Sequence, residues 1–149
     1  MNDKVFRCIG ASNHSSKDRA EYDYYSTDPS AIDWLLKYET FDNNIWECAC
    51  GNGNLSRKLE EHGYNVKSTD IVYRGYGERE SIDFLKQTAA FDGDIITNPP
   101  YIKGGEFILH ALNLSKNKVA MFLKLQFLEG KGRFEELYSK YPPYKVLPL

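Results

Sequence analysis

The stretch that organises this sequence is Ile45-Trp46-Glu47-Cys48-Ala49-Cys50-Gly51-Asn52-Gly53-Asn54. Its first six residues are almost entirely apolar, which predicts a buried strand over residues 45–50. The glycines that follow suit a tight turn, and Leu55 and Leu59 then recur at the spacing of a helix. A strand that enters a helix through a glycine turn is the first half of a strand–helix–strand unit, from which parallel sheets are built.

The same alternation of strands and helices continues on both sides of this stretch. Further strands are predicted at residues 66–71, 93–97 and 119–123. Further helices are predicted after Asp28-Pro29 and at residues 106–114 and 129–139. This order predicts an α/β fold, a mostly parallel sheet with helices on both faces.

Local signals mark the ends and the faces of these helices. Asp28 and Pro29 suit the N-cap and first turn of the first helix, and Gly63 suits the C-terminal cap of the helix after the glycine turn. Phe134 and Leu137 are expected to face inward from the last helix.

The composition suits one domain with a core of its own, since the chain has 149 residues and is 42% hydrophobic. Residues 1–20 are polar and predicted to be loose, and residues 21–149 to form the single domain. No apolar run approaches the ~20 residues that span a bilayer, and the start lacks the pattern of an export signal. We therefore expect a cytoplasmic protein without membrane contact.

The cysteines argue against both a disulfide framework and a metal site. There are three, Cys8, Cys48 and Cys50, and they lack the Cys-x-x-Cys or Cys/His spacing of zinc ligands. We expect reduced thiols that pack as small apolar groups, and no metal.

The charge is unevenly distributed along the chain. Residues 1–100 carry 11 Lys and Arg against 17 Asp and Glu, whereas residues 101–149 carry 8 against 4. The basic side chains after Tyr101 are candidates for a phosphate-facing surface, and scattered, solvated lysines are the alternative. These residues are Lys103, Lys116, Lys118, Lys124, Lys131, Arg133, Lys140 and Lys145.

A second informative run, Asn98-Pro99-Pro100-Tyr101, directly follows the strand predicted at residues 93–97. Two prolines fix the backbone and donate no hydrogen bond, so the carbonyl groups around them stay available to a ligand. The structural alternative is a strand terminated by proline, with Tyr101 packed on its end. In an open α/β sheet, ligands bind outside the carboxyl ends of the strands, where this run, the glycine turn and Asp70 are expected to converge.

The glycine turn has its own chemical signature. Its Gly-x-Gly spacing lacks the third glycine of the dinucleotide fingerprint, and no lysine follows it as in a triphosphate-binding loop. Glu47 is costly inside a strand unless it meets a cationic ligand or a backbone donor. Asp70 is suited to accept hydrogen bonds from both hydroxyls of a ribose. A glycine helix entry with an acidic cap remains the alternative for each feature alone.

Taken in order, these features closely resemble the class I S-adenosyl-L-methionine (AdoMet)-dependent methyltransferases. The run Glu47-x-Ala-x-Gly-x-Gly, then Asp70, Asp83-Phe84 and Asn98-Pro-Pro-Tyr101 is similar to the DNA adenine-N6 group in particular. Upstream, Tyr24-Tyr25-Ser26-Thr27-Asp28-Pro29 looks like the segment of that family that closes over the methionine end of the cofactor. The resemblance covers about residues 24–128, and the tetrapeptide is more specific than the glycine turn.

The resemblance implies a Rossmann-like methyltransferase fold and a set of cofactor-binding residues. It implies that Asp70 holds the ribose, that Ile71 presses on the adenine ring, and that Asp83 and Phe84 read and cover that ring. Asp83 as the N-cap of a short helix, and Ile71 and Phe84 as ordinary core residues, are the alternatives. The full implied cofactor set is Tyr25, Thr27, Glu47, Ala49, Cys50, Gly51, Gly53, Asp70, Ile71, Asp83, Phe84 and Asn98.

The resemblance also implies that Asn98, Pro99, Pro100 and Tyr101 are the catalytic residues. Hydrogen bonds from the adenine N6 amine to the Asn98 side-chain oxygen and the Pro99 carbonyl localise the nitrogen lone pair for in-line attack on the methyl group. Tyr101 stacks on the extruded base, and S-adenosyl-L-homocysteine is the product. Alternatives are methylation of another planar amine, in RNA or a protein glutamine, and an inactive AdoMet-binding or nucleic-acid-binding remnant.

Two features depart from the family pattern. The family's sheet ends with a sixth and a reversed seventh strand, which are expected to be missing here, so that residues 119–123 form an open edge. This edge predicts self-association, measurable as a concentration-dependent mass in solution scattering. No segment resembles a separate target-recognition domain.

Overall fold

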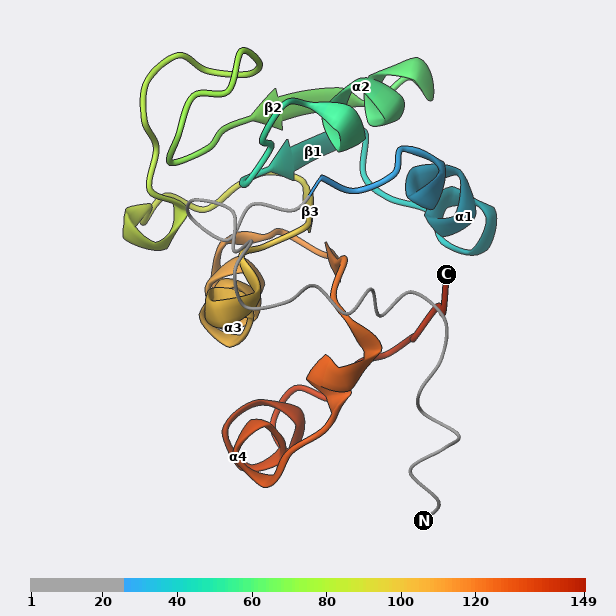
Figure 1. Cartoon of the computed structure of the whole chain (residues 1–149), viewed down its shortest axis with the longest axis vertical. Helices are drawn as coiled ribbons and strands as arrows, with labels where there is room; N and C mark the ends of the chain where they lie inside the picture. Colours follow the sequence, from blue (N-terminus) through green and yellow to red (C-terminus); the bar gives the residue numbers. More distant parts are fainter. Residues whose placement is uncertain (1–25) are drawn as a thin grey trace, which may run out of the picture.

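The computed structural model describes residues 26–149 and has an α/β fold, as predicted (Figure 1). Its centre is a four-stranded sheet in which every neighbouring pair of strands is parallel. The strands are β1 (Asn44–Glu47), β2 (Asn65–Ser68), β3 (Asp94–Thr97) and β4 (Val119–Met121). Their order across the sheet is β2-β1-β3-β4.

All four strands were predicted, and each is shorter than expected. The first strand ends at Glu47, and residues 48–50 belong to the turn that leads into the glycine loop. The second ends at Ser68, so Asp70 lies two residues beyond its carboxyl end. Both polar side chains are therefore at the carboxyl edge of the sheet, as required for a ligand site at that edge.

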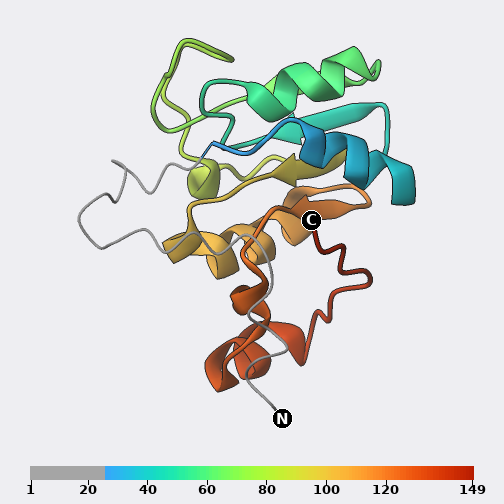
Figure 2. The same ribbon diagram turned by 45° about the vertical axis from the view of Figure 1, so that its right-hand side comes forward.

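Three helices cover the sheet, namely α1 (Ser30–Tyr38), α2 (Asn54–Glu61) and α3 (Gly104–Leu114). In Figure 2, α1 and α2 lie on one side of the sheet and α3 lies on the other. The Asp28 side chain accepts a hydrogen bond from the Ser30 amide at 2.8 Å, and Gly63 adopts φ +89° after α2. The N-cap position of α1 is Pro29, one residue after the predicted Asp28, which still accepts from a helix amide. Gly63 follows the C-cap residue His62 and has the left-handed conformation expected at the end of α2.

The helix predicted at residues 129–139 is wrong as a continuous α-helix. The chain forms a short turn, α4 (Lys131–Arg133), followed by the π-helical segment η5 (Phe134–Tyr138). Gly130, in a left-handed conformation at φ +104°, and Gly132 weaken the start of the helix. Leu137 is buried as predicted, whereas Phe134 is 61% exposed. Residues in a π-helical turn are spaced differently around the axis than in an α-helix, so Phe134 and Leu137 do not share one face.

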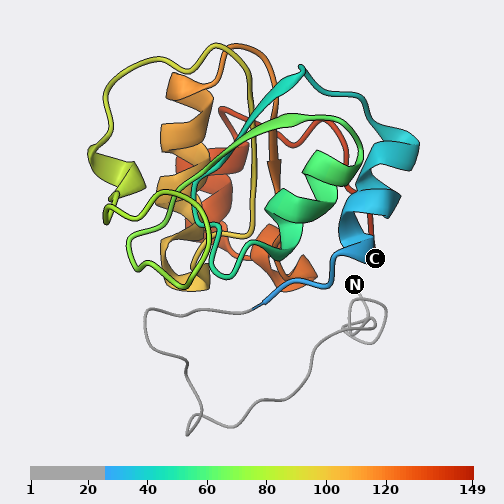
Figure 3. The same cartoon turned by 90° about the horizontal axis from the view of Figure 1, so that it is seen from above.

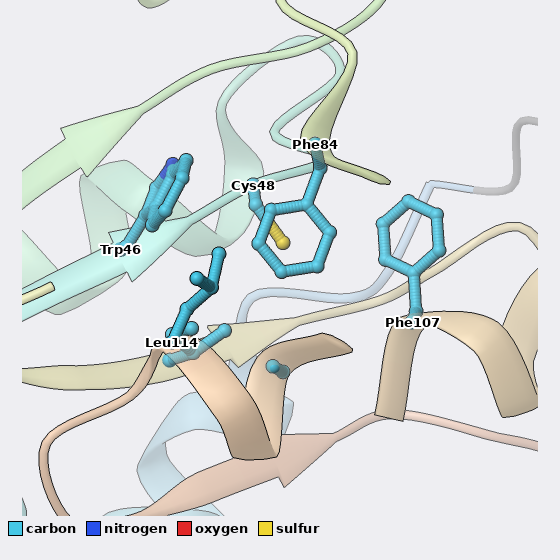
Figure 4. Close-up of a cluster of buried hydrophobic side chains, with 7 residues drawn as sticks. Trp46, Cys48, Phe84, Phe107 and Leu114 are labelled. Atoms are coloured by element: carbon cyan, nitrogen blue, oxygen red, sulfur yellow. The ribbon is translucent and has the colours of Figure 1, made fainter. Parts of the chain in front are cut away.

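The core forms on both faces of the sheet because successive strand residues point to opposite sides. Ile45 and Ile96 pack with α1 and α2, and Trp46 and Ile95 pack with α3. On the α3 face, Phe84 lies between Trp46 and Phe107, with ring centroids 5.2 and 5.1 Å away (Figure 4). Burial on both faces explains why the apolar residues of each strand are consecutive, Ile45-Trp46 in β1 and Ile95-Ile96 in β3.

The connections place a crevice at the carboxyl ends of β1 and β3. After β1 the chain passes through α2 to β2 on one side, and β3 then pairs with β1 on the other side. Such a switch in strand order leaves the carboxyl ends of the two central strands uncovered by helices, which is where ligands bind in open α/β sheets.

Within residues 26–149, β4 pairs with β3 and has no second neighbour, which confirms the expected open edge for this part of the chain. The self-association predicted from it stays a prediction. The C-terminal segment returns to the neighbourhood of α1 (Figure 3). There Lys145 Nζ donates a hydrogen bond to the Tyr38 carbonyl oxygen at 2.7 Å. No helix in the described residues has both the length and the apolar character needed to cross a bilayer.

Candidate active site

A cavity of about 380 Å³ opens at the carboxyl edge of the sheet. Its size is within the range of sites that hold small organic molecules. It brings together most of the residues predicted to bind a cofactor, although they come from separate segments of the chain. The predicted residues that line it are Thr27, Glu47, Ala49, Cys50, Asp70, Ile71, Asp83, Phe84, Asn98 and Pro100.

Glu47 provides a buried carboxyl group to this cavity, with 1% of its surface exposed. Its side chain accepts hydrogen bonds from the Thr97 hydroxyl and, at 3.2 Å, from the Ala49 amide. Burial raises the pKa of the Glu47 carboxyl to about 7, and the nearby charge of Asp70 contributes in the same direction. A cation in the cavity would favour the ionised form of this carboxyl.

Asp70 holds the glycine loop in place. Its Oδ2 atom accepts a hydrogen bond from the Gly51 amide at 2.8 Å, and its Oδ1 atom accepts one from the Val72 amide at 2.9 Å. Each carboxylate oxygen has two lone-pair positions, so these two bonds leave further acceptor capacity on a residue that lines the cavity. Asp70 therefore has a structural role in addition to the ligand role predicted for it.

Gly51 and Gly53 shape the loop without lining the cavity. Both have positive φ, at +54° and +85°. A Cβ atom on Gly53 would overlap the ring of Tyr76, so the missing side chain makes room for that ring. Tyr76 is further held by a hydrogen bond from its hydroxyl to Glu60 Oε2 at 2.8 Å. Gly53 therefore has a packing role, and the ligand contact expected of it stays a prediction.

Asn98 follows the last residue of β3 and points its amide toward the segment before α1. Its Nδ2 atom donates a hydrogen bond to Thr27 Oγ1 at 2.6 Å. The neighbouring residue Ser26 accepts a hydrogen bond from Asn54 Nδ2 at 2.7 Å. Residues 26 and 27 thus connect the start of α2 with the end of β3 across the cavity.

The rest of the tetrapeptide divides between the cavity and its surroundings. Pro100 lines the cavity, whereas Pro99 is buried beside it and Tyr101 begins the 3₁₀ turn η3 (Tyr101–Lys103) outside the lining. Lys124 Nζ lies 4.9 Å from the centroid of the Tyr101 ring, a cation–π distance. Of the four predicted catalytic residues, Asn98 and Pro100 reach the cavity directly.

The residues predicted to surround an adenine ring also serve the fold. Asp83 is the N-cap of the 3₁₀ turn η2 (Phe84–Lys86), where its side chain accepts from the Leu85 amide at 3.1 Å. Phe84 is 2% exposed and belongs to the core cluster, while Ile71 is 39% exposed. The alternatives for Asp83 and Phe84 are therefore confirmed as structural roles, and all three residues nevertheless line the cavity.

The described cysteines are neutral thiols. Burial raises the pKa of the Cys48 thiol far above its ordinary value and the pKa of Cys50 to about 12. Neither is a thiolate nucleophile near neutral pH. Within residues 26–149, no group of three or more His, Cys, Asp or Glu side chains is placed to hold a metal ion.

The basic residues after Tyr101 do not gather on one surface. Lys103 lines the cavity and Lys124 lies beside Tyr101. By contrast, Lys118 and Lys145 both bind Glu39, and Lys118 directly precedes β4, at the opposite edge of the sheet from Asn98. The expectation of a common phosphate-facing surface is wrong for that pair, because ion pairing holds both lysines at the far end of the fold.

Several residues that line the cavity were not among the predicted site residues. Arg74 and Ile82 belong to the loop after β2, whose path depends on long-range contacts such as that between Tyr76 and Gly53. Asn54 directly follows the glycine loop, so a polar side chain at a helix start was the signal that could have identified it. The predicted site residue Tyr25 lies outside the described residues.

Comparison of this chain with protein families, with curated protein sequences and with solved structures gives no match. We therefore infer function from the cavity and from the chemistry of the residues around it.

Proposed function

We propose that this chain is a Rossmann-like methyltransferase that transfers the methyl group of AdoMet to the exocyclic N6 amine of adenine in DNA. The observation that carries the proposal is the meeting of Glu47, Asp70 and Asn98 around one cavity at the carboxyl edge of the sheet. These residues come from three separate segments of the chain. Each has the polarity required either by the methyl donor, AdoMet, or by the methyl acceptor, the adenine amine.

The donor half of the cavity fits AdoMet in charge and in polarity. Glu47 and Asp70 provide acidic groups for a ligand that carries a sulfonium and an amino group. Ile71, Ile82 and Phe84 provide an apolar wall of the kind that binds a flat ring. When bound, AdoMet supplies a methyl group that is already activated by its positive sulfur.

The acceptor half is formed by the tetrapeptide. Asn98 and Pro100 line the same cavity as the acidic residues, so an amine held by the Asn98 carbonyl oxygen is close to the donor half. Holding two reactants together removes roughly 7 to 11 kcal/mol from a barrier, the largest contribution that we assign to these residues. Lys103 and Lys124 provide positive charge beside the tetrapeptide, which favours a nucleic acid as the acceptor.

The test is transfer of a labelled methyl group from AdoMet to a panel of DNA, RNA and release-factor acceptors. We expect label in adenine-containing DNA and at least about a hundredfold slower transfer by Asn98→Ala, because the amine loses its acceptor. Asn113→Ala, at an exposed position on α3, is the matched control. Label found only in protein glutamine would show that the acceptor is not adenine. Unchanged methyl transfer by Asn98→Ala would refute the proposed role of Asn98.

A further inference from the structure

The segment formed by Ser26 and Thr27 makes two hydrogen bonds that belong to different halves of the cavity. Asn54 Nδ2, at the start of α2, donates to Ser26 Oγ at 2.7 Å. Asn98 Nδ2, after β3, donates to Thr27 Oγ1 at 2.6 Å. The Thr27 hydroxyl oxygen, which the resemblance placed among the cofactor-binding groups, therefore accepts a hydrogen bond from the side chain of Asn98.

This bond matters because the two ends of an asparagine amide are chemically opposite. The nitrogen end only donates hydrogen bonds, and the oxygen end only accepts them. The terminal torsion of an asparagine side chain has broad preferences, so partners and not intrinsic rotamers fix the plane of the amide. With Nδ2 bound to Thr27, the donor end of the amide is held, and the other polar atom of the side chain is the carbonyl oxygen, which accepts hydrogen bonds.

We infer that Thr27 is a positioning residue, which holds the amide of Asn98 so that its carbonyl oxygen receives the acceptor amine. The inference rests on the proposed function, since it describes how one residue of that site is oriented. It gives Thr27 a role in the acceptor half of the reaction, beside the cofactor contact that the resemblance implied. Both residues line the cavity, so the bond between them is inside the site.

The two roles of Thr27 predict different kinetic changes. A ligand of the cofactor affects the dissociation constant of AdoMet, whereas a residue that orients Asn98 affects kcat. A misplacement of about 1 Å in a reacting group can lower activity by about 100-fold. We expect Thr27→Val to lower kcat by about tenfold or more, and to leave the dissociation constant of AdoMet within about twofold of the parent.

The experiment measures AdoMet binding by calorimetry and single-turnover methyl transfer for the parent, Thr27→Val and Thr27→Ser. The serine variant retains the hydroxyl and is expected to restore most of kcat. Thr40→Val, which removes a hydroxyl at an exposed position after α1, is the matched control and should match the parent. Thr27→Ala replaces the valine variant if the latter does not fold.

A readout without turnover follows the bond itself. In the ¹⁵N spectrum of the parent, the Asn98 side-chain amide should exchange with solvent more slowly than exposed asparagine amides, and its exchange should be faster in Thr27→Val than in the parent. Weakened AdoMet binding with unchanged kcat, or equal kcat in the parent and Thr27→Val, would overturn the inference while methyl transfer by the parent still stands. Absence of methyl transfer in the parent would instead refute the proposed function, and the inference with it.

Discussion

At neutral pH the carboxyl of Glu47 is balanced between its protonated and ionised forms, because burial raises its pKa to about 7. The ordinary value is 4.5, so the folded state binds more protons than the unfolded state between these two values. Stability from this group is therefore highest below pH 4.5, falls as the pH rises through about 7, and is fully lost above it.

This residue yields a prediction about stability. Glu47→Gln keeps an oxygen that accepts from Thr97 and Ala49 but cannot ionise. Relative to this variant, we expect the parent to lose on the order of 3 kcal/mol of unfolding free energy between pH 5 and pH 8. Urea unfolding at both pH values measures the difference. A gap between the two proteins that does not change with pH would contradict the buried, neutral carboxyl.

The glycine loop and the loop after β2 act together as one structural unit. Tyr76 of the second loop packs against Gly53 of the first, and the Cys50 thiol donates a long hydrogen bond to the Tyr76 carbonyl oxygen at 3.8 Å. The second loop in turn contributes Ile71, Arg74 and Ile82 to the cavity lining. The contact at Gly53 therefore supports one wall of the candidate site.

Substitution of two glycines in these loops distinguishes the cost of backbone strain from the cost of a steric clash. Gly53 and Gly75 have φ values of +85° and +91°, but a Cβ at Gly75 would meet no atom within 4 Å. We expect Gly75→Ala to cost about 1 kcal/mol, and Gly53→Ala to cost at least about 2 kcal/mol because the Tyr76 ring must also move. Thermal unfolding compares the two variants. When Tyr76→Ala is combined with Gly53→Ala in one chain, part of the stability lost in Gly53→Ala should be recovered. Equal losses of stability in Gly53→Ala and Gly75→Ala would contradict the packing role of Gly53.

The sequence predicted the strands and the first three helices well, because their signals are local. The period of apolar residues and the caps at Asp28 and Gly63 do not depend on distant contacts. The path of residues 71–83 and the exposure of Phe134 could not be predicted in this way. They depend on which side chain reaches a given glycine and on a π-helical turn, neither of which leaves a periodic pattern.

At the scale of the whole molecule, lysine side chains lie at both ends of the sheet, and those at the carboxyl end are beside the cavity. Lys103 and Lys124 lie at the cavity and beside Tyr101, whereas Lys116 pairs with Asp92 at 2.7 Å, near the amino end of β3. If DNA binds at the carboxyl edge, the first two lysines contact phosphates and the third does not.

Salt dependence of DNA binding tests this orientation. Each lysine that contacts a phosphate adds about 0.9 to the slope of log affinity against log salt concentration on duplex DNA. We expect Lys103→Gln and Lys124→Gln each to lower the slope by about that amount. Lys116→Gln removes the same charge from the opposite edge and should leave the slope unchanged. An equal effect of all three variants would indicate binding without a preferred face.

The identity of the methylated group, the exocyclic N6 amine of adenine, is tested most directly by analysing the bases of the product. Oligonucleotides that contain adenine, and matched ones in which purine without the exocyclic amine replaces adenine, are incubated with AdoMet and the parent protein. Their nucleosides are then identified by mass spectrometry. We predict N6-methyladenine from the first substrate and no methylated base from the second. No methylated base from the adenine substrate, or equal methylation of both, would contradict the claim.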